Sequence, residues 1–205
     1  MAAAQDDPGP AKAIGVQLRY ALIGGDLVSG ESWHDLFRDS TGIGLQYTML
    51  WRTSKDIQVG WYTGISFDQF PGDESSVTIG SGAHVLVDPE TMTLQRHTLG
   101  VAARLRIGAL DLQPRFGIGF AIYDRVDADV RSGSMQFEVH AIEPSIEFTL
   151  EVGVASSMVV SERLNITVGL TYEWNNPPSD SPDLGIDGFD AQENVVLDLG
   201  LKYAF

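Results

Sequence analysis

The chain has 205 residues, no cysteine, 43% apolar residues and a formal net charge of −15. The charge argues against a nucleic-acid partner, the lack of cysteine excludes disulfides and thiolate metal sites, and the apolar content excludes a disordered chain. Spanning helices are excluded too, because no apolar run approaches the roughly 18 residues that a membrane helix needs.

Residues 1–11 have neither the basic start nor the apolar core of a secretory signal. We expect them to form a flexible N-terminal segment, with any export signal already removed. The remaining residues, 12–205, are expected to form one domain.

Eight segments of this domain alternate between apolar and polar side chains, the period of a β-strand with unlike faces. They are residues 12–28, 43–54, 57–70, 93–108, 112–126, 140–159, 164–175 and 195–205. Long connections at 29–42, 71–92, 127–139 and 176–191 alternate with short turns. The sequence therefore predicts an all-β, eight-stranded antiparallel up-and-down barrel, with the long loops at one rim and the short turns and both chain ends at the other.

Alternation alone does not tell which face is inside. A soluble, lipocalin-like barrel points its apolar side chains inward, whereas a transmembrane barrel points them at lipid. Aromatic residues collect near both strand ends, as in the girdles of membrane barrels. The short-turn rim has Trp51, Trp61, Phe116, Tyr203 and Phe205, and the long-loop rim has Phe67, Tyr172 and Trp174.

The charges of the polar face also favour the transmembrane arrangement. Seven basic residues on this face oppose six acidic ones, so it nets +1 while the rest of the chain nets −16. Buried charges have to be matched, because an unpaired one costs several kcal/mol. The basic residues are Arg19, Arg52, Arg104, Arg106, Arg115, Arg125 and Lys202, and the acidic ones are Asp68, Glu143, Glu147, Glu151, Glu173 and Asp198.

With its terminal Tyr203-Ala204-Phe205, its strand count and its loop alternation, the chain resembles the small eight-stranded outer-membrane barrels of Gram-negative bacteria. These include the transmembrane domain of outer membrane protein A and the opacity-type families. The resemblance covers residues 12–205. It implies residence in the bacterial outer membrane, contact with outer-membrane lipid and lipopolysaccharide, and recognition of Phe205 by the outer-membrane assembly machinery.

The interior of an eight-stranded barrel is just wide enough for its own side chains. We therefore expect Arg19, Arg104 and Arg115 to pair with Glu147, Glu151 and Asp198 in a structural charge network that fills the lumen. An open pore is not expected, and neither is a cofactor. A gate that re-pairs to pass ions, or a carrier of small apolar ligands, is the channel-type alternative.

Catalysis and cation binding are further alternatives. The first long connection contains the three residue types of a catalytic triad, a nucleophile, a base and an orienting group, in Ser32, His34 and Asp35. A triad is defined by its geometry, however, and not by the spacing of its residues in the sequence. His97-Thr98 departs from the His-x-Ser pattern of the deacylase barrels, and His84 and His140 lie alone at loop ends.

Two acidic clusters could attract divalent cations such as calcium. They are Asp124, Asp127 and Asp129, and Asp180, Asp183, Asp187 and Asp190. Neither has the spacing of a calcium-binding loop. The sequence thus predicts a non-catalytic outer-membrane barrel that displays acidic loops in a structural, adhesive or protective role, with a lipid-A-modifying enzyme as the alternative.

Overall fold

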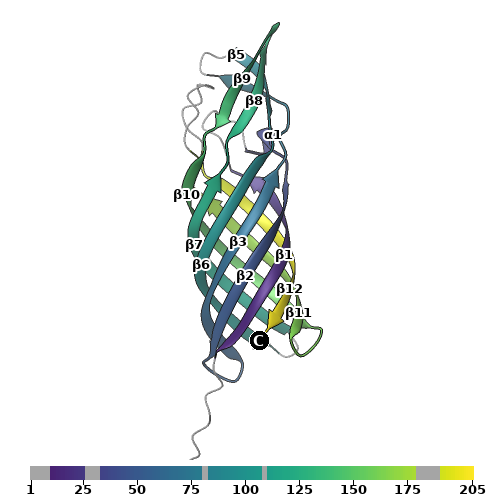
Figure 1. The fold of residues 1–205 in the computed structure, drawn as a ribbon, viewed down its shortest axis with the longest axis vertical. Helices are drawn as coiled ribbons and strands as arrows, with labels where there is room; N and C mark the ends of the chain where they lie inside the picture. The colour runs from purple at the N-terminus through teal and green to yellow at the C-terminus, as the bar shows by residue number, and fades with distance from the viewer. Residues whose placement is uncertain (1–9, 26–32, 80–82, 108–109, 179–189) are drawn as a thin grey trace, which may run out of the picture.

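The computed structural model describes residues 10–25, 33–79, 83–107, 110–178 and 190–205. Eight antiparallel strands close into a barrel in the order β1-β12-β11-β10-β7-β6-β3-β2 (Figure 1). They are β1 (Ala11–Gly24), β2 (Ser40–Arg52), β3 (Ile57–Phe70), β6 (Met92–Ile107), β7 (Leu110–Tyr123), β10 (Ser145–Val159), β11 (Leu164–Asn175) and β12 (Gln192–Ala204). The predicted eight-stranded barrel is confirmed, and the pairing of β1 with β12 closes it.

The barrel wall has an apolar outer face and a buried inner face. Along β1, Val16 and Leu18 are 57% and 63% exposed, while the intervening Gln17 is buried. Leu199 on β12 and Phe148 on β10 also point outward, with 53% and 43% of their surface exposed. Such a belt of hydrocarbon is unfavourable in water, at about 25 cal/mol per Å², and suits the lipid-facing band of a membrane barrel.

Aromatic rings cluster on the outside at the short-turn rim. Tyr47 lies 5.4 Å from Trp61 and 6.4 Å from Phe205, measured between ring centroids, and Phe205 is 6.5 Å from Tyr203. These contacts join strands β2, β3 and β12 across the closing seam, and amphipathic rings at this level suit a membrane interface.

Two of the connections predicted as long loops are instead strands. β4 (Ser75–Ile79), β5 (Ala83–Pro89), β8 (Val126–Ser132) and β9 (Met135–Ile142) form a second antiparallel sheet, ordered β4-β5-β8-β9, beyond the ends of the barrel strands (Figure 1). We call it the outer sheet. The prediction was wrong because the turn-forming residues of 71–92 and 127–139 masked a real alternation, in which Val126, Ala128 and Val130 are buried and Arg131 is exposed.

The apolar core of the molecule lies at the long-connection end of the barrel. The short helix α1 (Trp33–Leu36) contributes Trp33 and Leu36, both buried. These side chains belong to one buried cluster that also includes inward residues of the barrel strands, such as Phe70 and Leu94, and residues of the outer sheet, such as Val130. Among the described residues, no helix has the length and apolarity required to cross a membrane.

Candidate functional site

The middle of the lumen holds a set of buried ion pairs centred on Arg19 of β1. Its guanidinium contacts three carboxylates from three strands: Asp68 at 3.1 Å, Glu173 at 2.6 Å and Asp198 at 3.4 Å. The Arg19 side chain is only 5% exposed. Alternation places all four residues on the inner face, and closure of the barrel brings β1, β3, β11 and β12 close enough for one arginine to reach across.

Two further arginines extend this set. Arg96 on β6 pairs with Asp68, and its Nη1 lies 2.6 Å from Glu173 Oε2. Arg115 on β7 lies 3.0 Å from Asp198 and 3.8 Å from Glu151. We call these residues the lumen network. Its members are Arg19, Asp68, Arg96, Arg115, Glu151, Glu173 and Asp198.

Tyr62 on β3 joins the network through Glu151 on β10, two strands further than its neighbour β6. Its hydroxyl donates a 2.5 Å hydrogen bond to Glu151 Oε1, and the residue is buried. Two glycines on β6 and β7, the strands between Tyr62 and Glu151, leave room for the ring. A Cβ at Gly100 would lie 2.6 Å from Tyr62 Cε1, and one at Gly117 would lie 2.2 Å from its hydroxyl. These glycines are therefore needed for the Tyr62 ring to lie over the inner face of β6 and β7 and reach Glu151.

The lumen network leaves almost no free space. A cavity of about 20 Å³ lies beside Arg19, Arg115 and Glu151, which is room for about one water molecule. Above it, towards the long connections, the buried apolar cluster fills the barrel end. The arrangement is thus a closed set of ion pairs beneath a buried apolar cluster.

The predicted site residues are only partly brought together. Arg19 meets Asp198, and Arg115 meets both Glu151 and Asp198. Arg104 was expected to join them, but it pairs instead with Asp111. Its position near the short-turn end of β6 puts it too far along the barrel axis.

The pairing expected for Glu147 was also wrong. Glu147 is half-buried at the other end of the lumen, two residues from the outer end of β10, and it forms no ion pair within the described part of the chain. Two other members of the predicted polar face, Arg125 and Glu143, lie in the connection between β7 and β10 rather than in the barrel wall.

Two inward charges, Arg96 and Asp111, were missing from the prediction. Arg96 is an even number of residues from Gly100 and Ala102 and therefore lies on the same face of β6. Extending the alternation by four residues towards the start of the strand would have placed it on the inner face. Asp111 was assigned to a turn, but it is buried at the start of β7, where Arg104 and Arg106 both contact it.

The catalytic candidates do not form a triad in the described structure. His34 and Asp35 are exposed on α1, and Ser32 lies outside the described residues. His97 points outward and stacks on Phe120 with a centroid separation of 4.7 Å. His140 contacts Asp127 at 2.7 Å on the outer sheet, and His84 is exposed on β5.

The acidic clusters have other contacts in the structure. Asp127 accepts a hydrogen bond from Arg125 at 2.9 Å, and Asp129 accepts one from Gln136 at 3.2 Å. No group of three potential ligands suited to a metal occurs among the residues that the structure describes. Asp180, Asp183 and Asp187 fall outside those residues.

No family model matches the chain, and no curated protein sequence matches it. Solved structures do. The outer membrane protease OmpT from Escherichia coli aligns over 98% of each chain with a TM-score of 0.56 and 9% identity. A major outer membrane protein from Thermus thermophilus aligns over 95% of this chain and 99% of its own, with a TM-score of 0.52 and 12% identity.

The outer membrane protein OprG from Pseudomonas aeruginosa aligns over 96% of each chain, with a TM-score of 0.50 and 15% identity. At such identities the likeness concerns the fold and not the activity. The chain therefore has the fold of bacterial outer-membrane β-barrels, with its apolar strand faces outward and its charged faces around a filled lumen.

Proposed function

We propose that the chain is an integral outer-membrane protein whose barrel is a sealed anchor and whose role is carried by its acidic outer end. That role is structural, adhesive or protective, without catalysis. Outer-membrane lipid and lipopolysaccharide surround the barrel wall, and Phe205, exposed at the end of the chain, is the element that the assembly machinery recognises.

The distribution of charge is the observation that carries this proposal. The four connections at the outer end are residues 25–39, 71–91, 124–144 and 176–191. Together they contain seventeen acidic and three basic residues, a net charge of −14 out of −15 for the chain. The barrel strands and short turns are therefore almost neutral, and the excess charge is concentrated where the protein projects from the membrane.

The filled lumen supports a display role over a channel. The lumen network and the apolar cluster occupy consecutive levels of the barrel, so a passing ion would have to displace both. A narrow channel predicts conductance in planar bilayers, whereas a sealed anchor predicts none.

The outer sheet supports an exposed interaction surface. It extends the chain beyond the barrel rim (Figure 1), and the β8–β9 hairpin turns at Gly133, whose φ is +60°. Near this turn Met135 and Phe137 are 66% and 47% exposed. Acidic residues surrounding a few exposed apolar side chains suit contact with a cationic surface or macromolecule.

The protein is expressed in bacterial cells to test two properties, the exposure of its outer end on the cell surface and the effect of its acidic residues on attachment. An epitope inserted after Gly133 should be labelled on intact cells, whereas one inserted between Lys55 and Asp56 should not. Neutralising three exposed acids of the outer end, Asp88→Asn, Glu90→Gln and Glu138→Gln, should weaken attachment of the cells to a polylysine-coated surface.

The matched control changes an exposed acid at the short-turn end, Glu162→Gln, and should leave attachment unchanged. Labelling of both epitopes, or equal attachment by all variants, would contradict the proposal. A mass shift of lipid A that depends on His34 would instead support the enzyme alternative.

A further inference from the structure

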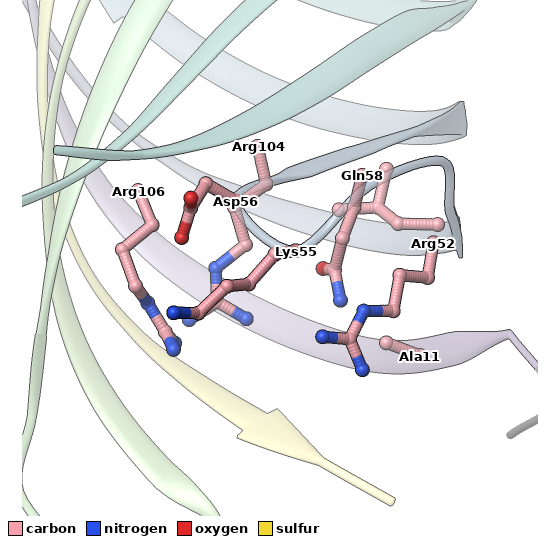
Figure 2. A pocket seen from close by; sticks show the side chains of 8 residues that line it. Ala11, Arg52, Lys55, Asp56, Gln58, Arg104 and Arg106 are labelled. Atoms are coloured by element: carbon pink, nitrogen blue, oxygen red, sulfur yellow. The ribbon is translucent and has the colours of Figure 1, made fainter.

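A basic pocket opens at the short-turn end of the barrel, opposite the acidic outer sheet. Its volume is about 290 Å³. Figure 2 shows that its long side chains extend towards the same side of the pocket. The lining residues are Ala11, Leu50, Arg52, Lys55, Asp56, Gln58, Arg104 and Arg106.

Strand register explains why these residues meet. Arg52 at the end of β2 pairs with Gln58 on β3, and Gln58 pairs with Arg104 on β6. The three inward side chains therefore form one row across three neighbouring strands. Arg106 follows two residues after Arg104 on the same face, and its amide donates to the Asp56 carbonyl at 2.9 Å, which holds the β2–β3 turn against β6.

The positive charges of this pocket exceed the negative charges around them. Four basic side chains line it, against the single acid Asp56. Arg104 and Arg106 share one further carboxylate, that of Asp111. Within the described residues, Arg52 and Lys55 form no ion pair, although the whole chain has a net charge of −15.

This excess has an energetic consequence. Like charges held close together repel each other, and elsewhere in the barrel each arginine of the lumen network has a carboxylate partner. An anion in the pocket would relieve the repulsion among its cations. The Arg104 side chain is 29% exposed, whereas Arg52, Lys55 and Arg106 are exposed, so dissolved salt screens most of the charge of the pocket.

We propose that this pocket binds a phosphate group, either free in solution or carried by a phospholipid headgroup. Guanidinium groups donate paired hydrogen bonds that match phosphate oxygens, and the Gln58 amide adds a neutral donor between two arginines. The volume accommodates a phosphate with a small substituent, since drug-sized ligands need about 300–1,000 Å³. The strand residues of the lining take inward positions, and Lys55 and Asp56 lie in the β2–β3 turn at the rim. The ligand therefore enters from the aqueous end of the barrel.

The first measurement is calorimetric titration of the detergent-solubilised full chain with sodium pyrophosphate, at low and at high salt. The double variant Arg52→Gln, Lys55→Gln should bind at least about tenfold more weakly, because it loses two of the four cationic donors and charge-assisted hydrogen bonds are stronger than neutral ones. Wild-type binding should weaken with added salt.

A matched control removes the same charge from the same rim without changing the pocket lining. Lys12→Gln with Arg163→Gln does this, since Arg163 lies in the β10–β11 turn, where it is exposed and donates to the Tyr203 hydroxyl at 3.3 Å. This control should bind as wild type does. Both variants keep the Arg104–Asp111 and Arg106–Asp111 pairs, so both should fold. The control should unfold at the same urea concentration as wild type, whereas the pocket variant should unfold at the same or a higher concentration, because it loses two mutually repelling cations.

A second measurement distinguishes the two sources of phosphate. Native mass spectrometry of the protein released from nanodiscs counts the phosphatidylglycerol molecules that it retains. If the Arg52/Lys55 variant retains fewer phosphatidylglycerol molecules than wild type and the control does not, the ligand of the pocket is a lipid headgroup. If the pocket binds pyrophosphate but both variants retain as much lipid as wild type, the ligand is a soluble phosphate. If neither ligand distinguishes the pocket variant from the control, the proposal is wrong.

Discussion

Replacing Arg19 with methionine removes the guanidinium that three buried carboxylates share. Asp68 and Glu173 keep Arg96 as a partner, and Asp198 keeps Arg115. The lumen network would then hold two cations against four carboxylates instead of three against four. Breaking a buried ion pair from one side costs about 3–5 kcal/mol, and because second partners remain we expect the loss to fall near the lower value, about 3 kcal/mol.

The assay is urea unfolding of the barrel in phospholipid vesicles, followed by tryptophan fluorescence. With a dependence on urea of about 1–3 kcal/mol per M, the midpoint should fall by about 1–3 M. The control is Arg131→Met, which removes an exposed pair with Glu74 at 3.0 Å and should cost about 0–1 kcal/mol. If Arg19→Met costs no more than this control, the lumen network does not stabilise the barrel.

Three further predictions each concern one residue. Tyr62→Phe deletes the donor to Glu151 and should lower the free energy of unfolding by about 1–3 kcal/mol in the same assay, whereas an unchanged value would show that the bond is energetically neutral. Leu199→Arg puts a charge on the lipid face near the middle of β12 and should cost about 2–4 kcal/mol in vesicles, so a neutral result would mean that this face does not meet hydrocarbon. On the outer sheet, the hydrogen bond from Arg125 lowers the pKa of Asp127 below its ordinary value near 3.8. The ionised carboxylate therefore supports the outer sheet above that value and its contribution is lost as the pH falls through the lowered pKa. The carboxyl ¹³C shift of Asp127 should titrate at higher pH in Arg125→Gln, and an identical titration would refute the assignment.

The barrel could be predicted from the sequence because its signal is local and repeated. Alternation such as Leu197-Asp198-Leu199-Gly200 sets both the strand and its two faces, and the order of long and short connections sets the topology. The pairing inside the lumen could not be predicted in the same way. Whether Arg104 reaches Asp198 depends on the stagger between strands, which a single strand does not encode, and its true partner Asp111 lies on the neighbouring strand at the same rim.

The outer sheet illustrates a second limit. Its strands are short and rich in residues that also favour turns, as in Val126-Asp127-Ala128-Asp129. The composition of these segments therefore predicted loops, although their side chains alternate as in a strand. Their pairing is non-local as well. β5 bonds to β8 through pairs such as Val87 and Val130, and these two strands become neighbours only because β6 and β7 pair below them in the barrel.

The orientation of the strand faces is the claim on which the rest depends, and spin labelling along β12 tests it most directly. The chain has no cysteine, so single cysteines can be introduced from Leu197 to Leu201 and labelled in vesicles. Positions 197, 199 and 201 should be accessible to oxygen dissolved in the bilayer and protected from a water-soluble nickel reagent, while positions 198 and 200 should be protected from oxygen. The reverse alternation, with Leu199 shielded from lipid and Asp198 open to it, would contradict the account.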